Sequence, residues 1–91
     1  MKKDPKVSVL MPVYNAGKYL NAAIESVLQQ TFGDFEFLIF NDASTDNSLD
    51  IIQSYADNRI VLINSGVNKG YLEHLNHGIR MARGKYIARM D

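Results

Sequence analysis

The stretch FEFLIFNDASTD, residues 35–46, decides the fold of this chain. Its first half is almost entirely apolar and aromatic, which predicts a strand that is buried on both faces. Its second half is polar and turn-forming. Ser44 or Thr45 can cap a helix that begins there, and the carboxylate of Asp46 suits the positive N-terminal end of that helix. The stretch therefore predicts a strand, a turn and the start of a helix.

Strands and helices alternate on both sides of this stretch. The apolar run of residues 7–13 predicts a strand before it, and Asn15 or a neighbour can cap the helix that follows. Residues 59–63 and 85–90 predict two further strands, and Gly84 is expected to close the last helix. This alternation predicts a Rossmann-like α/β fold, a parallel sheet with right-handed crossovers. Three apolar stripes mark the helices: Leu20, Ala23, Ile24, Val27 and Leu28; Leu49, Ile52, Tyr55 and Ala56; and Leu72, Leu75, Ile79 and Ala82.

Length and composition limit the classes of protein that fit. Ninety-one residues allow one domain, and 46% hydrophobic and 22% charged residues are ordinary globular values. Ten basic side chains balance ten acidic ones, so the charge gives no case for nucleic acid as a partner. The chain has no cysteine, which excludes a disulfide framework and a thiolate nucleophile.

The sequence also bears on membranes and targeting. No stretch approaches the roughly 18 apolar residues that a membrane helix needs. The first 13 residues faintly resemble a signal peptide, but their apolar run is short and no small-residue cleavage site follows it. We therefore expect a soluble, cytoplasmic chain, which can still be membrane-associated as part of a larger protein.

Polar residues gather where the predicted strands end. Ligands of open α/β sheets bind outside the carboxyl ends of the strands. The carboxylate of Asp42 can accept a ring N–H of a nucleobase, and Asp91 can hold a ribose hydroxyl or a metal-bound oxygen. These positions indicate a nucleotide site, although Asn, Asp and Ser also cap turns and helices. The strand ends carry Tyr14 and Asn15, Asn41 and Asp42, the loop 65–70, and Asp91.

Two common phosphate-binding motifs are missing. No G-x-G-x-x-G follows the first strand, and no G-x-x-x-x-G-K-[ST] occurs. A bound diphosphate would therefore need a divalent cation, for which Asp91 is the candidate ligand. His74 and His77 lack a third ligand, and the predicted stripe turns both outward, so we expect surface residues rather than a metal site. Tyr71 and Tyr86 are expected to be packing groups.

Five motifs, in the right order, resemble those of the inverting family 2 glycosyltransferases and span nearly the whole chain. Residues 7–15, VSVLMPVYN, resemble the opening strand with its P-x-Y-N turn, and residues 28–32, LQQTF, resemble the end of the first helix. Residues 36–46 resemble the segment E-x-x-x-V-D-D-G-S-T-D. The chain then resembles the family's run of N-x-G, N-x-G and A-x-G-x-Y-I at residues 68–70, 76–78 and 82–87. It resembles the start of the family's D-x-D motif at residues 90–91.

The resemblance implies the N-terminal, nucleotide-binding half of a GT-A fold. The family transfers a sugar with inversion from a nucleotide diphosphate donor, usually UDP-linked, to an acceptor that would be a saccharide or a lipid. By resemblance, Asp42 would bond the uracil N3–H, and Asp91 would reach the ribose or the metal, Mn²⁺ or Mg²⁺. Pro12, Val13 and Tyr14 would line the base pocket, and the loop from Asn68 to Gly70 would border the base.

The chain departs from the family pattern at two positions and in its length. Asn41 replaces the first Asp of the usual pair and Ala43 replaces Gly, whereas Asp42 keeps the acidic position. Residues 1–91 are expected to be a partial domain, because the second Asp of D-x-D and the catalytic base would lie beyond Asp91. We expect no sugar transfer by these residues alone. In the family's strand order, three-two-one-four, the fourth strand would be an exposed edge and favour self-association.

Two other functions are alternatives to a glycosyltransferase. A non-catalytic Rossmann-type module would bind a nucleotide such as NAD⁺ more tightly than UDP. A flavodoxin-like receiver or interaction domain needs an acidic cluster after the first strand and a phosphoacceptor Asp after the third. Tyr14 and Asn15 occupy the first of these places, and the loop after the third strand has no Asp. The sequence therefore favours the donor-binding part of a glycosyltransferase.

Overall fold

Strand β2 (Phe35–Asp42) lies inside the sheet, and all eight of its residues are buried. The computed structural model describes residues 4–30 and 32–90. Strands β1 (Val7–Val13) and β3 (Ile60–Ser65) flank β2, and β4 (Tyr86–Arg89) pairs with the far side of β1. All three pairings are parallel, in the order β3-β2-β1-β4. The predicted parallel α/β sheet and its strand order are confirmed.

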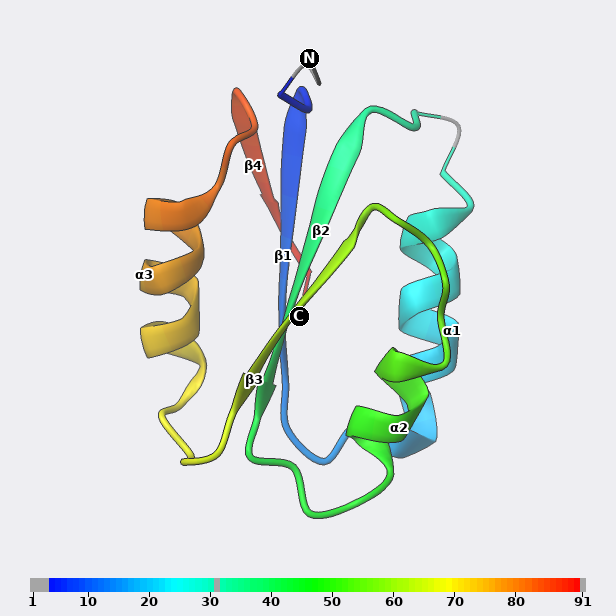
Figure 1. Cartoon of the computed structure of the whole chain (residues 1–91), viewed down its shortest axis with the longest axis vertical. Coiled ribbons are helices and arrows are strands. Elements are labelled where there is room, and N and C mark those ends of the chain that lie inside the picture. Colours follow the sequence, from blue (N-terminus) through cyan, green and yellow to red (C-terminus); the bar gives the residue numbers. More distant parts are fainter. Residues whose placement is uncertain (1–3, 31, 91) are drawn as a thin grey trace.

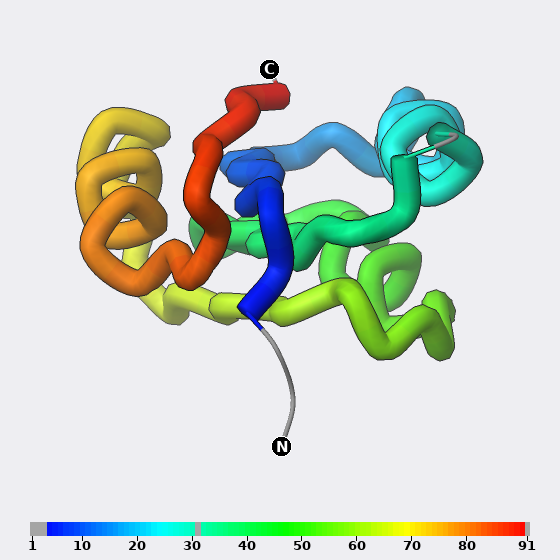
Figure 2. Tube along the Cα trace, turned by 90° about the horizontal axis from the view of Figure 1, so that it is seen from above, coloured from blue at the N-terminus to red at the C-terminus, as the bar shows by residue number. Residues whose placement is uncertain are grey.

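The helices cover both faces of the sheet. Helices α1 (Gly17–Leu28) and α2 (Ser48–Gln53) lie on one face, and α3 (Tyr71–Met81) lies on the other (Figure 1). The view from above shows the same three layers (Figure 2). Because side chains alternate along a strand, β1 and β2 supply residues to two separate cores. The larger core includes Val9, Met11, Ile24, Phe37 and Ile39, and the smaller core, on the α3 face, consists of Leu10, Leu38, Phe40 and Leu75.

Helix α3 is rotated relative to the stripe that the sequence predicted. Leu72 and Ile79 were expected in the core but are 62% and 55% exposed, while His74 and Gly78 are buried. A close approach to the sheet explains this rotation. A Cβ at Gly78 would lie only 3.0 Å from side-chain atoms of Leu10 and Phe40, so the helix presents its smallest residue to the sheet. The expectation that Tyr71 and Tyr86 are packing groups is also wrong, because both are more than half exposed.

Several helix ends differ from those that the sequence predicted. Helix α3 ends at Met81, and Gly84 lies instead against β1, where a Cβ would come within 2.5 Å of the Ser8 backbone nitrogen. Neither Ser44 nor Thr45 caps α2, which begins after Asn47 without a side-chain cap. Asp46 accepts the N–H of Ser48 at 2.9 Å, as expected for a carboxylate beside that helix start.

Strand β4 forms one edge of the sheet. It pairs with β1, which is its one strand neighbour in the described part of the chain, and all four residues of Tyr86–Arg89 are exposed. Ile87 is 46% exposed there. Within residues 4–30 and 32–90, no helix has the length and apolar character to cross a membrane.

Candidate functional site

Two turns lie together at the carboxyl ends of β1 and β2. Asn15 Oδ1 accepts hydrogen bonds from the backbone N–H groups of Thr45 and Asp46, at 2.7 and 3.3 Å. The N–H of Asn15 donates to Ser44 Oγ at 3.0 Å. Asp46 in turn accepts the N–H of Gly17, the first residue of α1, at 3.0 Å. Asn15 therefore joins the two turns instead of capping α1, and the ends of both strands are held at one place.

A small pocket of about 140 Å³ lies at this edge of the sheet. Its lining residues are Pro12, Val13, Tyr14, Asp42 and Tyr71. The structure thus brings together four residues that the sequence predicted for a nucleobase, from the ends of two neighbouring strands. Tyr71 also lines the pocket but was not among the predicted site residues. Its position directly after Gly70, at the start of the helix that follows β3, was the available signal, because that helix start lies at the same edge.

Asp42 is the most constrained polar residue of the pocket. It is 4% exposed, and its carboxylate accepts three hydrogen bonds. Oδ1 accepts from the Lys69 N–H at 2.7 Å and from His74 Nε2 at 2.8 Å, and Oδ2 accepts from the Gly70 N–H at 3.0 Å. Burial by itself raises the pKa of Asp42, but these hydrogen bonds outweigh burial and hold the pKa below its usual value. Asp42 is therefore an ionised acceptor at neutral pH.

His74 is buried, contrary to the expectation that it lies at the surface. It is 2% exposed, and its ring lies 5.4 Å from the ring of Phe40, centroid to centroid. The rotation of α3 explains the difference, because it turns this histidine toward the end of β2. His77, one turn later, is exposed as expected and lies 5.9 Å from the same Phe40 ring.

The loop before α3 reaches the site through its backbone. Gly70 adopts a φ of 83°, a left-handed conformation that favours glycine, and its N–H points to Asp42. Asn68 is exposed and is not among the residues that line the small pocket. The loop is thus tied to the pocket through the bond from Gly70 to Asp42, and its role as a border of the base stays a prediction.

The predicted metal ligand, Asp91, lies outside the described residues. Within residues 4–30 and 32–90, no group of three or more His, Asp or Glu side chains is arranged to hold a metal ion. A second pocket, of about 440 Å³, has His74 among its lining residues. Its charged lining groups are Lys69, Glu73 and Arg80.

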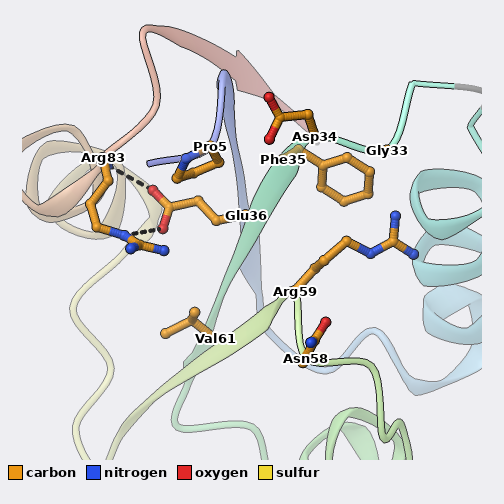
Figure 3. Close-up of a pocket in the computed structure, with 9 residues that line it drawn as sticks. All are labelled: Pro5, Gly33, Asp34, Phe35, Glu36, Asn58, Arg59, Val61 and Arg83. Atoms are coloured by element: carbon orange, nitrogen blue, oxygen red, sulfur yellow. Dashed lines mark hydrogen bonds and ion pairs between the residues drawn. The ribbon is translucent and has the colours of Figure 1, made fainter. Parts of the chain in front are cut away.

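A third pocket, of about 200 Å³, lies at the opposite, amino-terminal edge of the sheet (Figure 3). Glu36 lines it, and its carboxylate accepts hydrogen bonds from Ser8 Oγ at 2.6 Å and from Arg83 N and Nε at 2.7 and 3.1 Å. Burial raises the pKa of Glu36, but these bonds hold it below its usual value. Arg59, on the other side of the pocket, is paired with Asp57 at 2.7 Å. Glu36 thus joins β1, β2 and the turn before β4, whereas Asp57 and Arg59 pair within one turn.

The family model described as Glycosyl transferase family 2 matches residues 8–91. EpsE of Bacillus subtilis (strain 168) is 44% identical over the whole chain, which covers 34% of that protein. Chondroitin synthase of Escherichia coli is 41% identical over the whole chain, which covers 13% of it. The chain thus spans about a third or less of the relatives that it matches.

Solved structures agree with the fold. Staphylococcus aureus TarS (residues 1–349), solved in complex with UDP, has a TM-score of 0.86 and 30% identity, over 94% of this chain and 27% of that one. The mannosyltransferase PcManGT of Pyrobaculum calidifontis, in complex with GDP-Man and Mn²⁺, has a TM-score of 0.75 over 89% of this chain and 25% of that one. At 22% identity, the second likeness bears on the fold alone.

Proposed function

The chain belongs to glycosyl transferase family 2, and on that premise we propose that it supplies the donor-binding part of an enzyme that transfers a sugar from UDP. The observation that carries the proposal is the pocket at the ends of β1 and β2, with the ionised carboxylate of Asp42 in its wall. Within the 91 residues we assign no catalytic residue, and we expect no sugar transfer by this chain alone.

The base is proposed to bind through Asp42. A carboxylate has about four acceptor positions, and protein donors occupy three of them, which leaves one on Oδ2. Uracil offers one such donor, the N3–H. Tyr71 and Tyr14 are 55% and 53% exposed beside the pocket, so an aromatic ring is available for the base to stack on. TarS, the 30% identical neighbour, was solved with UDP, which supports the choice of nucleotide.

The diphosphate is proposed to need Mn²⁺ or Mg²⁺. The sequence lacks both phosphate-binding glycine motifs, and charge is balanced over the chain. When bound, such an ion would offset the charge of the departing diphosphate. Asp91 would be its one ligand from this chain, and further carboxylates would have to come from elsewhere in the enzyme. Complexes with Mn²⁺ occur in this fold, as that of PcManGT illustrates.

The acceptor and the location of the enzyme belong to the same proposal. A saccharide acceptor is supported by the 41% identity to a chondroitin synthase. A lipid acceptor and a cytoplasmic location, free or at a membrane, stay predictions from the sequence.

Nucleotide binding by the complete gene product tests this function. Titration calorimetry with Mn²⁺ present is expected to give a lower dissociation constant for UDP than for NAD⁺. Asp42→Ala should weaken UDP binding at least about tenfold, because a hydrogen bond to a charged group is worth about 1.5–3 kcal/mol. Asp50→Ala removes an exposed carboxylate of α2 that does not line the pocket, and it should keep the wild-type affinity.

The same titration tells the two main functions apart. Tighter binding of NAD⁺ than of UDP would refute the donor-binding function and favour a Rossmann-type module. Equal UDP affinity in wild type and Asp42→Ala would place the base somewhere other than this pocket.

A further inference from the structure

Asp42 can select one base only if its carboxylate is held in one orientation. The side chain has two rotatable bonds, and a carboxylate that turns presents different acceptor positions to the pocket. Two of its three bonds come from backbone N–H groups of Lys69 and Gly70, in the loop before α3. Residues 66–69 of this loop are all exposed. These two bonds therefore depend on how the loop is placed.

The third bond comes from a regular element. His74 belongs to the first turn of α3, is 2% exposed and packs against Phe40 in the smaller core. Its Nε2 lies 2.8 Å from Asp42 Oδ1. An ionised carboxylate only accepts hydrogen bonds, so Nε2 carries the hydrogen and donates it. The histidine is thus a donor fixed by the core rather than by the loop.

We infer that His74 is a positioning residue for nucleotide recognition, which keeps Oδ1 of Asp42 engaged so that only Oδ2 is open to the base. This inference rests on the proposed function. It predicts base selectivity as well as affinity. Uracil has a hydrogen on N3, whereas cytosine has a lone pair there and carries its donor on N4. A fixed carboxylate that faces N3 accepts from uracil and repels cytosine, but a carboxylate free to turn can also accept from the cytosine N4 amino group.

The ratio of UDP to CDP affinity is therefore the decisive measurement. Methionine and glutamine have side chains of the same length, but only glutamine has an N–H donor near the position of Nε2. In the complete gene product, His74→Met should lower the UDP-to-CDP affinity ratio at least about tenfold, by loss of one hydrogen bond to a charged group. His74→Gln should restore the ratio to within about twofold of wild type, as expected for a donor of similar reach.

His77→Met is the matched control. His77 lies on the same helix and against the same Phe40 ring, but it is exposed and does not line the small pocket. This variant should keep the wild-type ratio. Circular dichroism confirms that each variant is folded. A purely structural loss would weaken UDP and CDP binding equally and leave the ratio unchanged.

A measurement on the wild-type protein covers the case in which His74→Met does not fold. The Nε2–H of His74 should give an NMR signal that shifts when UDP saturates the site, while the ring signals of His77 stay in place.

The inference is overturned by an unchanged ratio in a folded His74→Met, or by a His74 signal that does not move. A wild-type protein that binds no UDP would overturn both the proposed function and this role of His74. If the wild-type protein binds UDP, and every variant prefers UDP to CDP by the same ratio as the wild type, the inference alone is overturned.

Discussion

Asn15 and Thr45 join the turns after β1 and β2 through a 2.7 Å hydrogen bond, in which the Thr45 N–H donates to Asn15 Oδ1. Asn15 also adopts a left-handed backbone conformation, with φ of 49°. Asparagine tolerates this conformation better than most residues do. Both properties depend on the same side chain, so one residue fixes the relative position of two strand ends that line the small pocket.

Replacement of Asn15 by Ala should lower the free energy of unfolding by about 1–2 kcal/mol. It removes the acceptor for two backbone N–H groups and places alanine at a positive φ. Urea denaturation followed by circular dichroism measures the change. Asn76→Ala, at an exposed position of α3, should change stability by less than about 0.5 kcal/mol. Equal effects of the two substitutions would contradict a bracing role for Asn15.

Ala43 is expected to be a strained position. Its φ is 55°, in the left-handed region, where a Cβ costs about 1–2 kcal/mol. Ala43→Gly should therefore stabilise the protein, by up to about 1 kcal/mol after the larger conformational entropy of glycine in the unfolded chain is deducted. Thermal unfolding measures the gain. The same substitution at Ala22, inside α1, should instead cost about 1 kcal/mol, and a loss of stability at both positions would refute the strain.

The ion pair between Asp57 and Arg59 should make part of the stability depend on pH. Side-chain and backbone hydrogen bonds from Arg59 lower the pKa of Asp57 to about 2, from an ordinary 3.8. A lowered folded-state pKa means that the stabilisation is complete above about pH 4 and is lost as pH falls toward 2. Asp57→Asn should cost about 1 kcal/mol at neutral pH. The difference in the free energy of unfolding between wild type and variant, measured by denaturation at several pH values, should vanish between pH 4 and pH 2. A difference that stays constant over this range would be evidence against the ion pair.

Strand β4 should cause self-association of the 91-residue chain. Within residues 4–30 and 32–90, no strand pairs with its outer edge, and all four of its residues are exposed. Ile87→Lys introduces a charge of the kind that natural edge strands use against pairing. Light scattering should show larger species for the wild-type chain than for this variant. Val67→Lys adds the same charge to an exposed loop and should leave the association as it is. A wild-type chain that stays monomeric at high concentration would contradict the prediction.

The order of elements could be predicted from the sequence because each strand is a short apolar run bounded by turn residues, as in residues 35–46. Asp42 could be placed at a site because the carboxyl ends of parallel strands meet at one edge. The rotation of α3 could not be predicted from the sequence, since Leu72 and Ile79 complete a better apolar stripe than His74 and Gly78 do. The close approach at Gly78 decided the rotation, and it depends on residues of β1 and β2 that lie far away in sequence.

The side chain of Ser8 makes the docking of β4 conditional on correct strand pairing. Ser8 Oγ donates to Glu36 and accepts the N–H of Gly84 at 2.8 Å, while the same Glu36 oxygen accepts the N–H of Arg83. Ser8 and Glu36 are register partners in β1 and β2. A slip of one residue between these strands would turn one of the two side chains to the opposite face. The turn before β4 would then have no acceptors for its N–H groups. Strand β4 can therefore dock only on a sheet in which β1 and β2 are paired in the correct register.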